Sequence, residues 1–219
     1  MKVLVTGSNG FIGKNLVFRL NEMNIEVKTF TKENSINELK ELIRDTDYIV
    51  HLAGVNRSKN NNKFDDINVG LTASICEAVK SFSQNISIIF ASSTQANSNN
   101  MYGKSKLGAE TLLKKLAIET SCSLYIYRLP NVFGKWCKPN YNSVVATFCN
   151  NVSQDLPIQI HDHEFEITLI YIDDVIDEFI RVIQGTKKNK QGLLVHPEYK
   201  IKIGDLAEQI NNLKESRNS

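Results

Sequence analysis

Three glycines near the start of the chain constrain its fold more than any other feature. They directly follow a short apolar run and are spaced as GxxGxxG, at Gly7, Gly10 and Gly13. The segment behind them carries apolar residues at helical spacing. A buried strand that turns on glycines into a helix is typical of a dinucleotide-binding turn, because glycine permits the tight turn and the helix N-terminus offers free N–H groups to phosphates.

Strand-like and helix-like segments alternate over the first 130 residues. The sequence predicts strands at 3–5, 26–30, 47–53, 86–90 and 124–129, and helices at 11–23, 36–44, 65–82 and 101–119. Such alternation is typical of parallel βαβ units with right-handed crossovers. We therefore predict an α/β fold, a Rossmann-type doubly wound parallel sheet.

The pattern loosens after Pro130. The sequence predicts a loop at 132–141, helices at 143–152, 173–183 and 203–213, and strands at 166–170 and 193–196. We expect residues 1–130 to form the dinucleotide-binding core. Residues 131–219 are expected to be mainly a small C-terminal substrate-binding lobe with returning helices and strands.

The composition is that of an ordinary globular protein, with 42% hydrophobic and 23% charged residues and a net charge of +2. So small a charge excess argues against nucleic acid or a membrane surface as a partner. There is neither a signal peptide nor the ~18 consecutive apolar residues of a membrane span, so we expect a cytoplasmic protein. The cysteines form no CxxC pair, and we expect reduced thiols and no metal. His51 is expected to be a hydrogen-bonded core residue, and His161 and His163 to lie on the surface.

The end of the second predicted strand distinguishes the two nicotinamide dinucleotides. A carboxylate there would bind the ribose 2′-hydroxyl of NAD, whereas a basic residue would accept the 2′-phosphate of NADP. This strand ends in Phe30, Thr31 and Lys32, without a carboxylate. We expect NADP(H), with Thr31 donating a hydrogen bond and Lys32 supplying positive charge. NAD(H) remains the alternative if Lys32 is only a solvated loop lysine.

A candidate catalytic pair lies in the fourth predicted helix, where Tyr102 and Lys106 form a YxxxK pattern. Residues four apart share one helix face, so the lysine can lower the pKa of the phenol and hold the nicotinamide ribose. The tyrosine can then exchange a proton with a carbonyl or hydroxyl group. Ser93 follows the preceding strand, at the sheet edge where ligands bind in open α/β folds, and could orient the substrate oxygen.

These motifs and their order resemble the extended short-chain dehydrogenases/reductases, the NAD-dependent epimerase/dehydratase family. The matching segments are TGSNGFIG at 6–13, HLAG at 51–54, Asn68-Val69, Ser92-Ser93, YGKSK at 102–106, RLPNVFG at 128–134 and YIDDV at 171–175. In that family the segment from Leu52 to Gly54 lies along the dinucleotide and Asn131 lies beside the substrate. The candidate cofactor-binding residues are therefore Gly7, Asn9, Gly10, Phe11, Ile12, Gly13, Thr31, Lys32, Leu52, Ala53, Gly54, Tyr102, Lys106 and Leu129.

Two further segments, HLAGVNR at 51–57 and GKWCKPNYNS at 134–143, are similar to the capsular-polysaccharide reductases of the CapF type. That resemblance implies NADPH-dependent reduction of the 4-keto group of a UDP-2-acetamido-2,6-dideoxy-hexos-4-ulose, in the UDP-N-acetyl-L-fucosamine pathway of surface-polysaccharide biosynthesis. It adds Trp136, Tyr141 and Asn142 to the candidate substrate-binding residues, although the two aromatic rings could equally pack a loop. The zinc-binding cupin domain of that group is expected to be absent from this chain.

Two features depart from the wider family. Ile167 replaces an arginine that often contacts the substrate diphosphate, and only eight residues separate Ser93 from Tyr102. A 4,6-dehydratase is disfavoured, because Thr94 and Gln95 stand where such enzymes carry an acidic pair. The alternatives are a nucleotide-sugar 4-epimerase with bound NAD and a non-catalytic dinucleotide-binding protein. The sequence leaves the oligomeric state undecided, and a homodimer formed through helices 65–82 and 101–119 is one alternative.

Overall fold

The structure is a computed structural model, and it describes residues 1–56, 64–82, 85–120, 122–186 and 193–216. Arg57 of the HLAGVNR segment lies outside the described residues. The chain divides into two compact units, the first comprising Met1–Leu129 and Ile176–Leu194 and the second comprising Pro130–Val175 and Val195–Ser219. Residues 176–194, expected in the C-terminal lobe, therefore return to the first unit.

The first unit is built on a five-stranded parallel sheet in the order β2-β1-β3-β4-β5. Its strands are β1 (Lys2–Thr6), β2 (Glu26–Phe30), β3 (Tyr48–His51), β4 (Ser87–Ser93) and β5 (Ser123–Leu129). The chain winds outward from β1 to β2 and then, on the other side, from β3 to β5. This arrangement confirms the predicted doubly wound α/β fold. Ligands bind beside the carboxyl ends of such strands, where the winding reverses.

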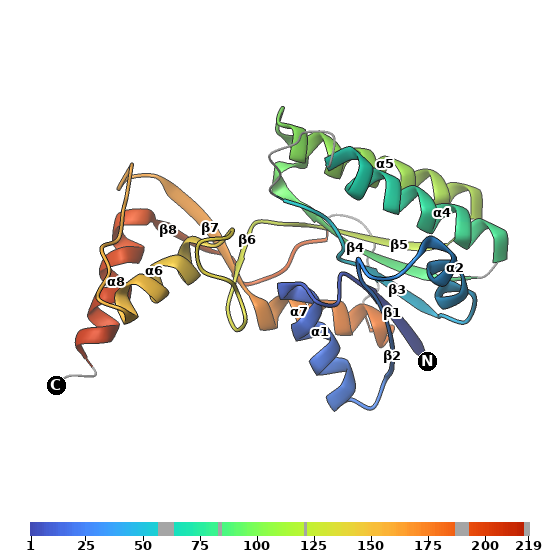
Figure 1. Cartoon of the computed structure of the whole chain (residues 1–219), viewed down its shortest axis with the longest axis horizontal. Coiled ribbons are helices and arrows are strands. Elements are labelled where there is room, and N and C mark those ends of the chain that lie inside the picture. Colours follow the sequence, from blue (N-terminus) through green and yellow to red (C-terminus); the bar gives the residue numbers. More distant parts are fainter. Residues whose placement is uncertain (57–63, 83–84, 121, 187–192, 217–219) are drawn as a thin grey trace. The chain divides into compact units, whose positions relative to one another are not determined.

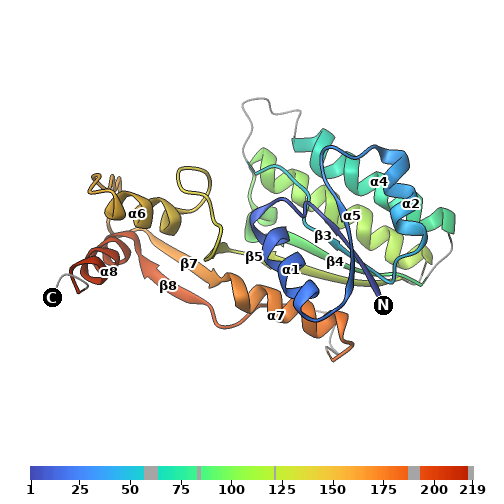
Figure 2. The same cartoon turned by 60° about the horizontal axis from the view of Figure 1, so that its bottom comes forward.

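Helices cover both faces of this sheet (Figures 1 and 2). On one face lie α2 (Ile36–Arg44), α4 (Gly70–Phe82) and α5 (Met101–Thr120). On the other face lie α1 (Phe11–Glu22) and the part of α7 (Ile172–Ile183) that belongs to this unit. The sheet is thereby shielded on both faces, as a parallel sheet with apolar strands requires.

The main core of the first unit lies between the sheet and the helices α2, α4 and α5. These helices bury Leu39, Ile75 and Leu113 in one cluster with Ile49 and Ile88 of the sheet. Each such side chain contributes roughly 1.5–3 kcal/mol on leaving water. The carboxyl ends of β1, β3 and β4 are thus held on a rigid support, which fixes the side chains that follow them.

Two boundaries in the first unit differ from the predictions and bear on function. The strand β4 was predicted at 86–90 with the hydroxyls of Ser92 and Ser93 at its end, and its ladder with β5 runs as far as Ser93, which pairs with Leu129. Ser93 is therefore held in the sheet. The helix predicted at 65–82 begins instead with a π-helical turn, Asp65–Val69, before α4 proper. Hydrogen bonds made by Asn68 in this turn, described below, account for the interruption.

The second unit contains a three-stranded sheet in the order β6-β7-β8. Its strands are β6 (Asn131–Phe133), β7 (Glu166–Tyr171) and β8 (Tyr199–Lys202), with β6 and β7 parallel and β7 and β8 antiparallel. The helices α6 (Val144–Ser153) and α8 (Ile203–Glu215) form an apolar cluster with Ile167 and Leu169 of β7. One face of the small sheet is thus covered by both helices (Figure 2).

Three predictions for the second unit were wrong. The loop predicted at 132–141 begins with β6, because this three-residue segment pairs with β7 and needs no periodic pattern of its own. The strand predicted at 193–196 is not formed, although its alternating Leu193 and Val195 are buried. The strand β8 was missed because Ile201 is its only aliphatic residue. For β6 and β8, pairing with β7 rather than local sequence decides the structure.

Candidate active site

The glycine turn after β1 is packed too tightly for any side chain at two of its three positions. Gly7 has a left-handed backbone (φ 70°), and a Cβ there would lie 2.7 Å from the backbone nitrogen of Ala53. A Cβ on Gly13 would lie 2.3 Å from the carbonyl oxygen of Gly7. The turn is closed by a hydrogen bond of 2.9 Å from the N–H of Gly10 to the same carbonyl. These contacts are the physical reason for the glycine spacing.

The helix α1 begins directly at this turn without a capping side chain. Gly10 occupies the N-cap position, no side chain accepts a hydrogen bond there, and the first turn carries no acidic residue. The N–H groups of the first helical turn and the positive end of the helix dipole are therefore available to an anion. Asn9 is exposed at the turn, and Phe11 and Ile12 are half-buried at the helix start. This is the arrangement that a dinucleotide diphosphate requires.

The turn after β2 is folded on its own side chains. The amide oxygen of Asn34 accepts hydrogen bonds from the N–H of Thr31, at 2.8 Å, and from its hydroxyl, at 3.3 Å. The Thr31 hydroxyl in turn accepts from the N–H of Glu33. Sequence reasoning expected Thr31 to donate to the cofactor, whereas here its proton is used within the turn. Lys32 is exposed.

The segment after β3 runs between the glycine turn and Lys106. The N–H groups of Leu52 and Ala53 donate to the hydroxyl of Thr6, each at 3.2 Å. Gly54 is exposed, and a Cβ added to it would lie 3.6 Å from Nζ of Lys106. The predicted dinucleotide contacts at 52–54 and at the glycine turn are thus brought together. Leu129, also predicted as a contact, is a buried side chain at the end of β5.

Ser93 and Tyr102 lie beside each other at the carboxyl ends of the strands, close enough for the Ser93 hydroxyl to influence the pKa of the phenol. Ser93 is the last residue of β4, and its hydroxyl also accepts from the N–H of Gln95 at 3.2 Å. Tyr102 lies in the first turn of α5, and its ring lies 6.2 Å from that of Phe64, centroid to centroid. Burial raises the pKa of Tyr102 above its usual value, and the hydrogen bond with Ser93 acts in the opposite direction. The phenol therefore keeps its proton at neutral pH.

Lys106 is buried one turn beyond Tyr102. Its ammonium donates to the carbonyl oxygen of Ala91 at 2.9 Å and lies 4.9 Å from the centroid of the Phe90 ring. Burial lowers the pKa of Lys106 to about 8, against an opposing effect of Glu110. Sequence reasoning expected the lysine to lower the pKa of the tyrosine. That expectation was wrong for this structure, because burial of the phenol dominates and raises its pKa.

A buried carboxylate behind the catalytic residues was missed by sequence reasoning. Glu110 lies in α5 four residues after Lys106 and accepts hydrogen bonds from Ser92 and Arg128. Burial raises the pKa of this carboxyl, but its bonds to Arg128 and Ser92 outweigh burial, so the pKa is lowered overall. The spacing of four residues from Lys106 was the available signal, since it places both side chains on one helix face.

The four predicted substrate-binding residues all belong to the second unit. Asn131 begins β6 and donates from its side-chain amide to the carbonyl oxygen of Thr168, at 3.2 Å. Trp136 has a left-handed backbone (φ 70°), and Nζ of Lys135 lies 4.6 Å from the centroid of its ring. Trp136, Tyr141 and Asn142 are exposed. These two contacts are with residues outside the set, so they do not join the four predicted residues to one another.

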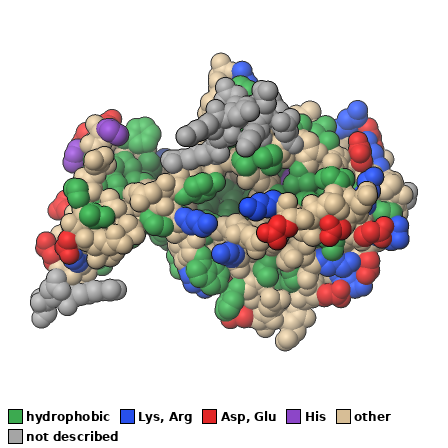
Figure 3. Space-filling view, in the orientation of Figure 1, with side chains coloured by type: hydrophobic (Ala, Val, Ile, Leu, Met, Phe, Trp, Pro, Cys, Tyr) green, Lys and Arg blue, Asp and Glu red, His purple; other side chains and the backbone are tan. Residues whose placement is uncertain are grey.

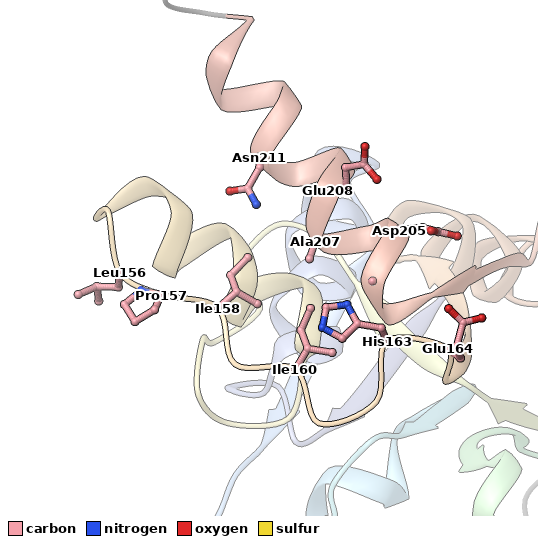
Figure 4. Close-up of a pocket in the computed structure, with 11 residues that line it drawn as sticks. Leu156, Pro157, Ile158, Ile160, His163, Glu164, Asp205, Ala207, Glu208 and Asn211 are labelled. Carbon is pink, nitrogen blue, oxygen red and sulfur yellow. The ribbon is translucent and has the colours of Figure 1, made fainter.

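A groove in the second unit contains none of the predicted site residues (Figure 4). It has a volume of about 700 Å³ and runs between the segment before β7 and the start of α8. Its lining residues are Leu156, Pro157, Ile158, Ile160, His163, Glu164, Gly204, Asp205, Ala207, Glu208 and Asn211. The carboxylate of Glu164 forms an ion pair with Lys202 at 2.6 Å.

Charges on the first unit are mixed on the face seen in Figure 3. Basic and acidic side chains alternate over that face without a large patch of one sign. Among the described residues, the chain has no helix that is long and apolar enough to cross a membrane.

Comparison with known proteins places these features in a family. The model of the NAD dependent epimerase/dehydratase family matches residues 3–196. The chain belongs to this family. The match begins in β1 and covers the glycine turn, the segment after β3, Ser93 and the YxxxK helix.

Two relatives of this family member resemble it over its whole length. A UDP-2-acetamido-2,6-beta-L-arabino-hexul-4-ose reductase from Pseudomonas aeruginosa is 51% identical over 220 residues, covering 100% of this chain and 59% of the relative. The crystal structure of the capsular polysaccharide assembling protein CapF from Staphylococcus aureus has a TM-score of 0.86 at 37% identity, covering 99% of this chain and 58% of that one. The chain thus spans somewhat under two thirds of the length of both relatives.

A more distant structure shows the same fold. The UDP-glucuronic acid 4-epimerase from Bacillus cereus, solved with NAD, has a TM-score of 0.85 at 21% identity, covering 98% of this chain and 85% of that one. At this identity the likeness concerns the fold alone. A shared fold of this kind does not by itself indicate a shared reaction.

Proposed function

We propose that this chain is a reductase unit that reduces the 4-keto group of a UDP-2-acetamido-2,6-dideoxy-hexos-4-ulose with NADPH. The observation that carries the proposal is that Tyr102 lies beside Ser93 and one helical turn before the buried Lys106, at the carboxyl ends of the strands that also hold the glycine turn. The 51% identity to a reductase named for such a 4-ulose supports the substrate class. The structural similarity to a capsular polysaccharide assembling protein supports a place for the reaction in nucleotide-sugar biosynthesis for surface polysaccharide.

The residues present fit a nicotinamide dinucleotide. The turn from Gly7 to Gly13 leaves no room for side chains and opens onto an uncapped helix start, which suits a diphosphate. Gly54 lies between the Asn68 side chain and Lys106, and a side chain there would meet Oδ1 of Asn68 at 2.8 Å, so glycine permits the close approach of this segment to Lys106. In the proposal the lysine would hold the nicotinamide ribose. When bound, the dinucleotide supplies the hydride that carbon 4 of the sugar receives.

Tyr102 is the proton donor in this proposal. A reduction requires an acid that is protonated before the reaction, and the raised pKa of Tyr102 meets that requirement. The Ser93 hydroxyl, which lies beside the phenol, would hold the keto oxygen within reach of it. Lys106 supplies positive charge close to the site, and its pKa of about 8 keeps it mostly protonated at neutral pH. Positioning and electrostatics together then favour the developing alkoxide.

The second unit contributes the substrate side of the proposal. Trp136 and Tyr141 are large rings that are exposed, at 47% and 50%. Exposed aromatic rings can stack on a uracil or a sugar, and the neighbouring Asn131 and Asn142 can hydrogen-bond to hydroxyl and amide groups. We therefore assign the UDP-sugar to the 131–142 segment.

The test is the consumption of NADPH, followed at 340 nm, when the enzymatically prepared UDP-4-keto-6-deoxy-N-acetylhexosamine is added. We expect oxidation of NADPH by the wild-type chain and a loss of roughly 10²–10⁴-fold in kcat for Tyr102→Phe. Tyr48→Phe is the matched control, because Tyr48 is the first residue of β3 and lies at the amino ends of the strands, whereas the candidate site lies at their carboxyl ends. Tight dinucleotide binding without oxidation of NADPH or NADH would contradict the reductase and favour a 4-epimerase that returns its hydride.

We also propose that the chain forms a homodimer through α4 and α5. The outer face of α5 carries exposed apolar side chains, with Leu107 exposed by 43% and Ile118 by 85%. Leu107 and Ile118 are eleven residues apart, about three helical turns, so they lie on one face of α5 that a second copy would cover. Sedimentation equilibrium of the wild type should give twice the mass of a single chain. The Ile118→Glu variant should give the mass of a single chain. A monomeric wild-type chain would contradict the dimer.

A further inference from the structure

A buried chain of hydrogen bonds runs from β1 to the catalytic helix. The Thr6 hydroxyl lies 2.8 Å from Nδ1 of His51, and Nε2 of His51 lies 3.0 Å from the Thr72 hydroxyl. Thr72 donates to the carbonyl oxygen of Asn68 at 2.6 Å, and the Asn68 amide donates to the Ser105 hydroxyl at 2.9 Å. All five side chains are at most 3% exposed. Water therefore cannot replace a hydrogen-bond partner that a substitution removes from any of these five side chains.

The hydrogen bonds of Thr6 indicate which nitrogen of His51 is protonated. A hydroxyl oxygen has two acceptor positions and one proton. The hydroxyl oxygen of Thr6 accepts from the N–H of Ala53 at 3.2 Å and shares the N–H of Leu52 with the backbone carbonyl oxygen of Thr6, again at 3.2 Å. Both of its acceptor positions are thus engaged, which favours donation of the hydroxyl proton to Nδ1 of His51. Nδ1 is therefore an acceptor and carries no hydrogen.

The Thr72 end gives the same answer independently. The single hydroxyl proton of Thr72 is directed at the carbonyl oxygen of Asn68, which can only accept. Thr72 therefore has only acceptor capacity left for His51, and Nε2 of His51 must be the donor. Both ends thus require neutral imidazole with its hydrogen on Nε2.

The surroundings of His51 keep it neutral. The ring stacks on Phe90 at 5.3 Å between centroids, and the same Phe90 ring faces the ammonium of Lys106. Burial, with a smaller effect of the nearby Lys106 charge, lowers the pKa of His51 to about 3. His51 does not take part in proton transfer at neutral pH, and its hydrogen bonds keep one fixed direction.

These hydrogen bonds hold the backbone segment 52–55 at both of its ends. At its start, Thr6 holds the N–H groups of Leu52 and Ala53. At its end, the Asn68 side chain accepts from the N–H of Val55 at 2.8 Å and donates to its carbonyl oxygen at 3.0 Å. His51 and Thr72 lie between these two sets of hydrogen bonds. The segment is the one that touches Gly7 on one side and approaches Lys106 on the other.

We propose that His51 is a positioning residue for dinucleotide binding: through Thr6 and Thr72 it fixes the segment 52–55 against the glycine turn and ties it to the catalytic helix. The last link is the Ser105 hydroxyl, which donates to the carbonyl oxygen of Tyr102 at 2.8 Å. The inference rests on the dinucleotide site of the proposed function, but it does not depend on which substrate is reduced.

The test compares Thr72→Val with Thr72→Ser in the full chain. Valine has nearly the shape of threonine but offers His51 no acceptor, whereas serine keeps the hydroxyl. For Thr72→Val we expect the Kd for NADPH, measured by nucleotide fluorescence, to rise about tenfold. Thr72→Ser should stay within about twofold of wild type. With the keto sugar, Thr72→Val should raise KM for NADPH while kcat at saturating NADPH changes little.

A second measurement uses the unmodified chain and does not depend on a variant folding. Two-bond ¹H–¹⁵N correlation spectra of ¹⁵N-histidine-labelled protein distinguish the two neutral tautomers of His51, the other three histidines being exposed. We expect the Nε2–H form. Hydrogen on Nδ1, or a folded Thr72→Val that binds NADPH like wild type, would overturn the inference. Binding of NADPH without turnover would contradict only the reductase, whereas no dinucleotide binding at all would overturn both.

Discussion

The guanidinium of Arg128 holds the carboxylate of Glu110 through two hydrogen bonds, of 2.8 Å from Nε and 2.7 Å from Nη2. Ser92 donates to the same carboxylate at 2.6 Å, and Arg128 also donates to the Asn97 side chain at 2.7 Å. Glu110 is 1% exposed. One carboxylate therefore joins α5 to the ends of β4 and β5 and, through Arg128, to the short helix Thr94–Asn97. These elements position Ser93 and Tyr102.

Replacing Glu110 by glutamine should destabilise the fold and lower activity. The amide cannot accept both hydrogen bonds of Arg128 and leaves a charge without its counter-ion. We expect a loss of about 3 kcal/mol in the free energy of unfolding, the lower end for a broken buried pair, because the Arg128 side chain is 33% exposed. Urea unfolding measures this loss, and steady-state assays should show a lower kcat.

Lys114→Ala is the control for this prediction. Lys114 also pairs with Glu110, at 3.4 Å, but its side chain is 57% exposed. Removing an exposed pair of this kind should change stability by less than about 1 kcal/mol. Equal losses for Glu110→Gln and Lys114→Ala would show that the buried Arg128 pair has no special importance.

Gly103→Ala should disturb the contact between the catalytic helix and the turn after Ser93. A Cβ at Gly103 would lie 2.1 Å from the carbonyl oxygen of Gln95 and 2.8 Å from that of Ser98. Neither backbone atom can move without shifting Ser93 or α5. We expect a loss of about 1–3 kcal/mol in stability, together with a lower kcat.

Gly108→Ala in the same helix provides the comparison. Its Cβ would meet only the end of the Val69 side chain, at 3.3 Å. Alanine also has a higher helix propensity than glycine, by about 1 kcal/mol. Thermal unfolding should therefore show Gly108→Ala at or above the wild-type stability. A Gly103→Ala protein as stable and as active as Gly108→Ala would contradict the tight contact.

The buried Lys106 should make stability depend on pH in a defined direction. Its pKa falls from 10.5 to about 8 on folding, so between these pH values the unfolded chain binds more protons than the folded one. Stability contributed by this group therefore rises with pH across that window and is lowest below pH 8. Relative to Lys106→Met, the wild type should gain about 3 kcal/mol between pH 7 and pH 10.5.

Urea unfolding of both proteins at several pH values measures this difference, since other titrating groups cancel in the comparison. A constant difference between wild type and Lys106→Met would mean that the pKa of Lys106 is not shifted by folding. A difference that moves in the opposite direction would mean that the ammonium is stabilised in the folded chain.

Lys32 should distinguish NADPH from NADH. It is the exposed positive charge at the end of β2, and the Thr31 hydroxyl beside it is already used within the turn. We expect Lys32→Ala to raise the Kd for NADPH about tenfold and to leave the Kd for NADH unchanged. Lys40→Ala, another exposed lysine on the following helix, should change neither. An equal effect on both dinucleotides would contradict a 2′-phosphate contact.

Much of the first unit could be predicted because its elements are locally encoded. The strands β1, β2 and β5 and the helices of the sheet carry regular apolar patterns, and the glycine turn has a backbone requirement that only glycine meets. The YxxxK pair and Ser93 follow from their places in that order. His51 was expected to be a hydrogen-bonded core histidine, and its bonds to Thr6 and Thr72 confirm this.

The rest could not be predicted because it depends on contacts between distant segments. The Glu110–Arg128 pair joins a helix and a strand, and the sequence does not reveal which residues of the two face each other. The strands β6 and β8 exist through pairing with β7 rather than through their own composition. The direction of the pKa change in Tyr102 depends on burial, which the spacing of Tyr102 and Lys106 does not reveal.

The buried ammonium of Lys106 has a consequence for protein engineering. Directed evolution that selects only for heat resistance would reward its replacement by an apolar side chain, because the proposed catalytic role is invisible to such a selection. Variants improved in this way would unfold at a higher temperature but would have lost their activity. A library built on this scaffold therefore needs a readout of NADPH oxidation in every round, with position 106 held fixed.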